Sequence, residues 1–159
     1  MSEFFGKYRG LVVNNVDPLQ QGRIQVSCPS VLGPEMPSWA MPNAPFVGIQ
    51  MGMFAIPQIG AKVWVEFEAG DPDKPIWSGG FWGPGEAPAL PPVPQVVTIK
   101  MLTGSVTIND LIGSVIIETT IGAKIMLSPA GIEIDNGQGA SIRMIGPMVS
   151  INNGALDVT

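Results

Sequence analysis

Two pairs of acidic residues and one cysteine are the side chains whose types and spacing could do chemistry. Glu66 and Glu68 lie two residues apart in a strand-like run, so they would share a face, which is the minimum for a catalytic carboxylate pair. Asp71 and Asp73 follow in a proline-containing segment and have the oxygen ligands that a metal-binding loop needs. Cys28 is the only cysteine, so a nucleophilic thiol is conceivable whereas an intrachain disulfide is not.

The residues around these groups do not predict an enzyme. Histidine is absent, which excludes His-based triads, His general bases and His metal ligands. Nothing separates the pKa values of the two glutamates, so a solvated strand face is the favoured interpretation. Aspartate beside proline is ordinary turn chemistry, and a lone cysteine in a strand is typically a small buried apolar residue. We therefore expect no catalytic residue, no metal site and no cofactor.

The composition favours an assembly subunit. Hydrophobic residues make up 45% of the chain and charged residues only 13%, so part of the apolar surface is expected to face other chains. The net charge is -5 and the basic residues are scattered, which gives nucleic acid no stripe to bind. The N-terminal residues MSEFFGKYRG lack the pattern of a secretory signal, so we expect cytoplasmic synthesis without a signal peptide.

Frequent glycine and proline break every helical period, which predicts an all-β chain. Residues 1–83 are expected to form a small five-stranded barrel, in which Val63, Val65 and Phe67 face inward. Trp77, Phe81 and Trp82 would close its core, with some contact to the region that follows. The expected strands are Tyr8–Asn14, Arg23–Cys28, Phe46–Phe54, Lys62–Glu68 and Ile76–Phe81.

Four methionines cluster around the third expected strand, at positions 36, 41, 51 and 53. Core filling and contact with a hub or neighbouring subunit are equally compatible with them. Residues 84–95 are proline-rich and read as a stiff linker, because proline supplies no ladder donor.

Residues 96–159 contain a short repeat. Glycines at positions 104, 113, 122 and 131 are nine residues apart, and a pair of alternating apolar residues follows each one. Each unit predicts one short strand and one corner, which indicates a β-helix. The pairs, including two that follow at looser spacing, are Val106 and Ile108, Val115 and Ile117, Ile125 and Leu127, Ile132 and Ile134, Ile142 and Met144, and Val149 and Ile151.

Such a short segment would bury little apolar surface by itself. Three chains wound together could share one axial core made of these paired residues, with polar side chains facing outward. Strand edges would then be paired between the chains, which would protect an apolar β segment from aggregation. The sequence therefore predicts a homotrimer.

Four stretches in this order resemble the oligosaccharide/oligonucleotide-binding (OB) base domain of phage baseplate spike proteins and VgrG proteins. They are YRGLVVNNVDPLQQGRIQVSCP, SWAMPNAP, PQIGAKVWVEFEAGDPDKPIWSGGFW and the repetitive tail ending in INNGALDVT. The resemblance implies an OB-fold barrel followed by an intertwined trimeric β-helix at residues 96–159. It also implies a structural central spike that docks on a baseplate hub protein and meets the target membrane only transiently, on firing.

The chain differs from these relatives in two ways. It begins at the barrel, so we expect the hub to be a separate protein, and its short linker leaves no room for a lysozyme domain. Assembly in the baseplate of a phage tail or phage-tail-like particle is expected. An OB-fold binding module for oligonucleotide or oligosaccharide is the alternative, and it ranks second because the aromatic residues are expected to face inward, away from the scattered basic residues.

The C-terminal end lacks the histidines that bind iron in the pointed tips of some related spikes. A blunt β-helix would leave its last ladder groups unpaired, an edge that a separate cap could cover. The resemblance implies a conical PAAR-type tip protein, seated on Asn152 to Thr159. The expected contacts are Asn152, Leu156, Val158 and Thr159.

Overall fold

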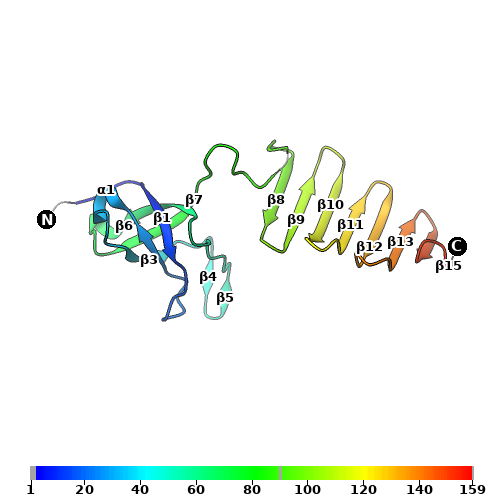
Figure 1. Ribbon diagram of the computed structural model, residues 1–159, viewed down its shortest axis with the longest axis horizontal. Coiled ribbons are helices and arrows are strands. Elements are labelled where there is room, and N and C mark those ends of the chain that lie inside the picture. Colours follow the sequence, from blue (N-terminus) through cyan, green and yellow to red (C-terminus); the bar gives the residue numbers. More distant parts are fainter. Residues whose placement is uncertain (1–2, 90, 159) are drawn as a thin grey trace. The chain divides into compact units, whose positions relative to one another are not determined.

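The computed structural model describes residues 3–89 and 91–158 of the chain (Figure 1). Two compact units divide between Gly83 and Pro84. Each has its own sheet, and each is described here by itself.

The first unit is a closed five-stranded barrel, as the sequence predicts. Its strand order is β1-β2-β3-β7-β6, with β6 pairing back onto β1. All neighbours are antiparallel except β3 and β7, which run parallel. Two short turns of helix, α1 (Pro29–Leu32) and the 3-10 turn η1 (Glu68–Gly70), connect the strands. The barrel strands are β1 (Tyr8–Asn14), β2 (Ile24–Ser27), β3 (Ser38–Pro42), β6 (Lys62–Phe67) and β7 (Pro75–Gly80).

Alternate side chains of these strands fill the barrel. Val63, Val65 and Phe67 are all buried, which confirms the inward face predicted for this strand. Cys28 is buried as well, in a core of mostly aliphatic residues. The core consists of Val12, Ile24, Val26, Cys28, Ala40, Val63, Val65, Phe67 and Trp77.

The third expected strand, 46–54, is wrong. This segment forms a separate hairpin of β4 (Val47–Gly48) and β5 (Met51–Gly52), and the barrel strand is β3 instead. Gln50 has a φ of 57°, and a Cβ on Gly52 would lie 2.9 Å from the Phe46 carbonyl oxygen, so the chain reverses here. β3 was not predicted because it contains Pro42, which has no backbone N–H to donate to a ladder. The strand tolerates this proline because it pairs with β7 at only two positions, so few of its backbone N–H groups have to donate there.

The second unit is an eight-stranded antiparallel sheet in which every strand pairs with the next along the chain. The expected unit of one short strand and one corner is present, and Gly113 and Gly122 take positive φ at two corners. The strands are β8 (Val96–Lys100), β9 (Gly104–Asn109), β10 (Ser114–Thr119), β11 (Lys124–Ser128), β12 (Gly131–Asp135), β13 (Ser141–Ile145), β14 (Met148–Ile151) and β15 (Leu156–Val158).

The corners reverse the chain, and this corrects one expectation. Each inner strand from β9 to β14 has a ladder partner on both sides within the same chain. Pairing of these strand edges between chains is therefore ruled out in this arrangement. A nine-residue period suits a strand of five or six residues plus a tight turn, which lets neighbouring strands pair locally. Contacts of these inner strands with other chains must then form through the faces of the sheet.

Candidate functional site

The residues predicted to form the shared core all lie on one face of the second sheet. Val115 is opposite both Ile108 and Leu127 in the register, and Ile117 is opposite both Val106 and Ile125. Residues opposite one another in neighbouring strands point to the same side, so the alternating pairs line up into two continuous rows across the sheet. We call this surface the apolar face; its residues from β9 to β14 are Val106, Ile108, Val115, Ile117, Ile125, Leu127, Ile132, Ile134, Ile142, Met144, Val149 and Ile151.

The apolar face extends one strand further in each direction. On β8, Val97 is opposite Ile108, and Ile99 is opposite Val106. The β8 pair was missed because it precedes the first glycine of the repeat.

Two of the expected tip contacts continue the same rows at the other edge. On β15, Leu156 is opposite Ile151, and Val158 is opposite Val149. Asn152, another expected tip contact, instead accepts a hydrogen bond through its side chain from the backbone N–H of Ser141 (3.0 Å). Thr159 lies outside the described residues.

In a single chain the apolar face is open to solvent. Ile117 is 48% exposed and Leu127 is 44% exposed, whereas the aliphatic side chains of the barrel core are almost completely buried. A contiguous apolar surface across eight strands is far more than a soluble monomer ordinarily exposes. This face therefore requires a covering partner.

The opposite face of the sheet is mainly polar. The hydroxyls of Thr98 and Thr107 are hydrogen-bonded at 2.8 Å. Glu133 forms ion pairs with Lys124 (3.2 Å) and Arg143 (3.4 Å) on the two adjacent strands. These groups suit contact with water, so the two faces differ clearly in chemistry.

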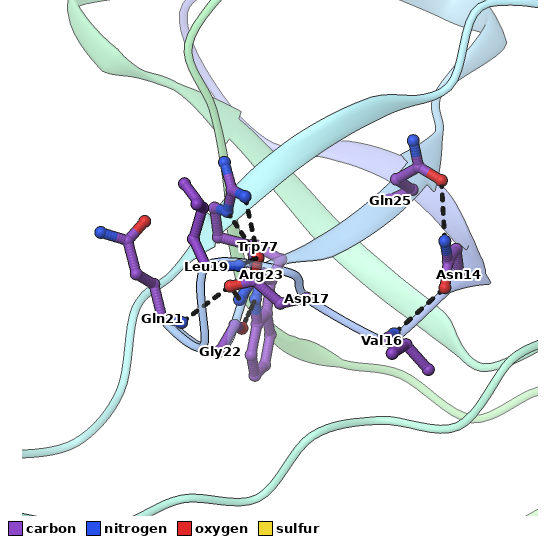
Figure 2. Close-up of polar contacts among 9 residues, drawn as sticks. All are labelled: Asn14, Val16, Asp17, Leu19, Gln21, Gly22, Arg23, Gln25 and Trp77. Carbon is purple, nitrogen blue, oxygen red and sulfur yellow. Dashed lines mark hydrogen bonds and ion pairs between the residues drawn. The ribbon is translucent and has the colours of Figure 1, made fainter.

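On the barrel, the most densely bonded feature is the turn from Asp17 to Arg23 (Figure 2). The Asp17 carboxylate accepts backbone hydrogen bonds from Leu19, Gln21 and Arg23, and Arg23 donates to it through Nε (3.1 Å) and Nη2 (2.8 Å). Only 5% of the Asp17 side chain is exposed. The Arg23 guanidinium, followed by these backbone donors, holds the pKa of Asp17 well below its usual range.

The turn is also fixed to the barrel wall. The Trp77 Nε1–H donates to the Gly22 carbonyl at 3.3 Å, and the Arg23 guanidinium lies 5.1 Å from the centre of the Trp39 ring. Gly22 has a φ of 78°, which favours glycine, and a Cβ there would also crowd the Phe54 ring at 3.3 Å and Ile56 at 3.4 Å. The turn is therefore a rigid structural element, in which the one carboxylate is occupied by its own neighbours.

Two of the four acidic residues singled out in the sequence, Glu66 and Asp71, have structural partners. Glu66 pairs with Lys7 at 3.1 Å, and hydrogen bonds from Lys7 and then Ser78 lower the pKa of Glu66. A general acid needs a raised pKa, and the pKa of Glu66 is shifted in the other direction. Asp71 accepts a hydrogen bond from the Asp73 backbone N–H (3.0 Å), as expected for a turn. Among the described residues, no group of three or more acidic or cysteine side chains could hold a metal ion.

The aromatic residues at the end of the barrel follow the expectation only in part. Trp77 is in the core, but Trp82 is 68% exposed. Phe81 packs on Trp64 outside the barrel, with ring centres 4.6 Å apart, and the Arg9 guanidinium lies 5.2 Å from the Phe81 ring centre. The expectation that the aromatics all face inward is therefore wrong at these positions, because Phe81 follows the last residue of β7 and is no longer bound by its alternation.

All four methionines have large exposed fractions, between 44% and 73%. Core filling is thus the wrong interpretation of this cluster, which leaves contact with a hub or a neighbouring subunit as a prediction. Met51 and Met53 belong to the β4–β5 hairpin region, which is taken up below.

Each of the two units matches the model of a known protein family. Residues 8–82 match the type VI secretion system/phage-baseplate injector OB domain, and residues 96–157 match the phage baseplate V C-terminal trimerisation domain. No curated protein matches the chain. In the part of the chain that the structure describes, no helix is long and apolar enough to cross a membrane.

The two matches together cover most of the chain, in the order that the resemblance predicted. Both matched families are structural components of baseplates, which favours a spike over an enzyme or an oligonucleotide- or oligosaccharide-binding module. The trimerisation match supports a homotrimer that associates with a baseplate and is assembled in a phage-tail-like particle. The chain belongs to the baseplate spike family of phage tails and type VI secretion systems, with an injector OB barrel and a C-terminal trimerisation domain.

Proposed function

We propose that three copies of this chain form the central spike of a contractile injection machine, with the apolar faces of their sheets packed together on one axis. The observation that carries the proposal is the pair of unbroken apolar rows, which lie on one face only and fall within the trimerisation match. The spike transmits force and penetrates the target; it carries out no reaction itself.

Packing through faces is the arrangement that the hydrogen bonds allow. The inner strands use their ladder groups within one chain, so the attraction between chains must come from side-chain burial. Fully burying a Val, Leu or Ile side chain stabilises by roughly 1.5–3 kcal/mol. Ten of the twelve residues of the apolar face are still 37–48% exposed, so each of these contributes about 1 kcal/mol more on association. The polar faces then lie outward, where their ion pairs meet water.

The trimer is expected to depend on the second unit. A chain ending at Pro91 keeps the closed barrel and its complete core but loses the apolar face, so it should sediment as a monomer at concentrations where the full chain is a trimer. Sedimentation velocity on both proteins measures this. A monomeric full-length chain would contradict the proposal, and a trimeric barrel would move the main interface to the first unit.

The proposed spike docks on a baseplate hub and carries a PAAR-type tip protein at the β15 edge. In the described part of the chain, β15 pairs with β14 on one side only. Its other side offers free ladder groups to an added strand, and three such edges in a trimer would form a platform. Leu156 and Val158, at the end of the apolar rows, would contribute contact at the base of the tip.

Removal of residues 152–159 is expected to abolish capture of a co-expressed PAAR protein. The truncation deletes β15 and leaves β14 as the new edge of the sheet. The truncated chain therefore has no Leu156 or Val158 to contact the tip protein. A pull-down with the tagged full chain and the tagged truncated chain compares them. Sedimentation of the truncated chain is the control, because binding is interpretable only if that chain is still a trimer. Equal capture by both trimers would contradict this location for the tip.

A further inference from the structure

The β4–β5 hairpin presents bulky apolar side chains to solvent. Ile49 at its tip is 92% exposed, and Phe46 and Met51 are both more than 60% exposed. Figure 1 shows the hairpin extending from the barrel, and only four residues pair in its two strands. We call Phe46, Ile49 and Met51 the hairpin knob. Nothing in the barrel core depends on these three side chains.

An apolar hollow of about 350 Å³ lies between the hairpin and the barrel wall. The barrel side consists of residues 42–45 and 77–79, and the hairpin side includes Val47, Met53 and Phe54. Since an engineered apolar cavity of about 150 Å³ can take up benzene, this hollow has room for more than one aliphatic side chain. None of the three knob residues lines it, so the knob is directed elsewhere and does not fill the hollow of its own barrel.

The segment that forms the hairpin and most of the lining of the hollow carries no charge. Residues 36–61 contain no Asp, Glu, Lys or Arg, although they include the hairpin and nine of the fourteen residues that line the hollow. The centres of protein interfaces are depleted of charged residues and enriched in Met and aromatic residues, and this segment has both properties. A solvated surface of this size would ordinarily carry charges.

Three-fold symmetry identifies the group that fills the apolar hollow. Around a three-fold axis, two neighbouring subunits cannot meet through the same patch, so each must offer two different surfaces that fit one another. One barrel carries both members of such a pair, an apolar projection and an apolar hollow. A contact of this kind closes into a ring of three.

Because the linker tethers the barrels, even a weak contact between them is sufficient to hold them together. Fifteen residues separate Gly80 at the end of β7 from Val96 at the start of β8, a reach of at most about 45–50 Å even when fully extended as polyproline helix. Barrels tied to one trimeric domain by such a linker are present to one another at an effective concentration in the millimolar range. A separate partner would have to compete with this concentration for the same surface.

We propose that the hairpin knob of each barrel inserts into the apolar hollow of the neighbouring barrel in the trimer. This inference rests on the proposed trimer and adds a second, barrel-to-barrel interface to it. Ile49 enters the hollow, where it contacts the Trp77–Gly79 segment of the neighbour. The three barrels are thereby held as a closed ring, which gives the spike a rigid base.

Site-directed cross-linking in the full-length chain tests the contact. A tagged Ile49→Cys chain and an untagged Ser78→Cys chain are co-expressed, and mixed trimers are treated with a short bis-maleimide. Each chain then carries one accessible thiol, because Cys28 is fully buried. A link between a tagged and an untagged chain is therefore intermolecular. We expect this product in high yield, at least five-fold above the control.

The matched control replaces Ile49→Cys with Ile59→Cys, which changes another exposed isoleucine that neither belongs to the knob nor lines the hollow. Sedimentation of each mixture is run in parallel. A trimer in which the Ile49 and Ile59 variants cross-link equally, or not at all, overturns the barrel contact and leaves the trimer standing. A monomer overturns both proposals.

A second variant tests whether the hairpin knob binds the hub protein instead of a neighbouring barrel. Ile49→Lys places a charge at the tip of the knob and is expected to release the barrels from one another, seen as loss of the Met51→Cys to Ser78→Cys cross-link in the mixed trimer. If the cross-link is absent in the parent trimer and Ile49→Lys instead abolishes capture of the hub protein, the knob binds the hub and the inference is wrong.

Discussion

Replacement of Ile117 by aspartate is expected to abolish the trimer. Ile117 lies in the middle of one apolar row, opposite Val106 and Ile125, and association would bring three copies of the new carboxylate to the axis. Each carboxylate would lose its hydration and repel the others, at a cost of several kcal/mol per chain. The change should lower the trimer association constant by at least three orders of magnitude. Sedimentation velocity over a range of protein concentrations measures it.

The matched control is Ile116→Asp, the same substitution one residue earlier on the opposite face. Ile116 is opposite Thr107 and Met126, so its new carboxylate would face outward. We expect this variant to remain a trimer with only a moderately lower melting temperature. Retention of the trimer by Ile117→Asp, or equal loss by both variants, would show that the apolar face is not the interface.

The parent trimer should also dissociate slowly, because its chains separate only when the apolar rows along all eight strands come apart together. This differs from the mechanism that intertwined strands would give, in which ladder hydrogen bonds between chains have to break. The rate is accessible by dilution followed by timed sedimentation.

The faces of the second sheet could be predicted from the sequence because a strand fixes side-chain direction locally. Every second residue points to the same side, so the pairs such as Val115 and Ile117 identify a common face without any knowledge of the fold. The alternation contains no information about which strands are neighbours. Pairing within one chain or between chains satisfies the same pattern, and the tight corners decided it in favour of one chain.

The barrel shows the complementary limit. Val63, Val65 and Phe67 alternate with polar residues and were placed correctly, whereas β3 contains Pro42 and has no clear alternation. Its position depends on closure of the barrel, a long-range property that joins β2 to β7. The hairpin at 46–54 has the more strand-like composition, but its glycines reverse the chain before a barrel strand can form. The apolar hollow beside it could not be predicted, since its walls come from segments far apart in the sequence.

The turn at Asp17 is the barrel feature with the largest expected effect on stability. Asp17→Asn keeps the size of the side chain but removes its charge and one acceptor oxygen, so Arg23 loses its ion pair and backbone donors of the turn lose a partner. We expect the melting temperature of the barrel to fall by several degrees at neutral pH. Asp73→Asn, in another turn and exposed, is the matched control and should leave the melting temperature unchanged.

The effect of Asp17 is expected to depend on pH in a defined direction. Its pKa in the folded barrel lies below the usual value of about 4 because of Arg23 and the backbone donors, so the folded form gives up this proton more readily than the unfolded chain does. Its contribution to stability is therefore complete above pH 4 and is lost as the pH falls toward the folded pKa. Glu66, whose pKa is lowered by Lys7, acts in the same direction.

Thermal unfolding of the parent and Asp17→Asn proteins between pH 2.5 and pH 7 separates this effect from general acid denaturation. The parent should lose stability below pH 4 more steeply than the variant, so the difference between their melting temperatures shrinks with acid while the Asp73→Asn protein follows the parent throughout. A constant difference across this range would mean that the Asp17 side chain stabilises the turn through its shape and not through its charge. In that case Arg23 would be held by its stacking on Trp39 alone.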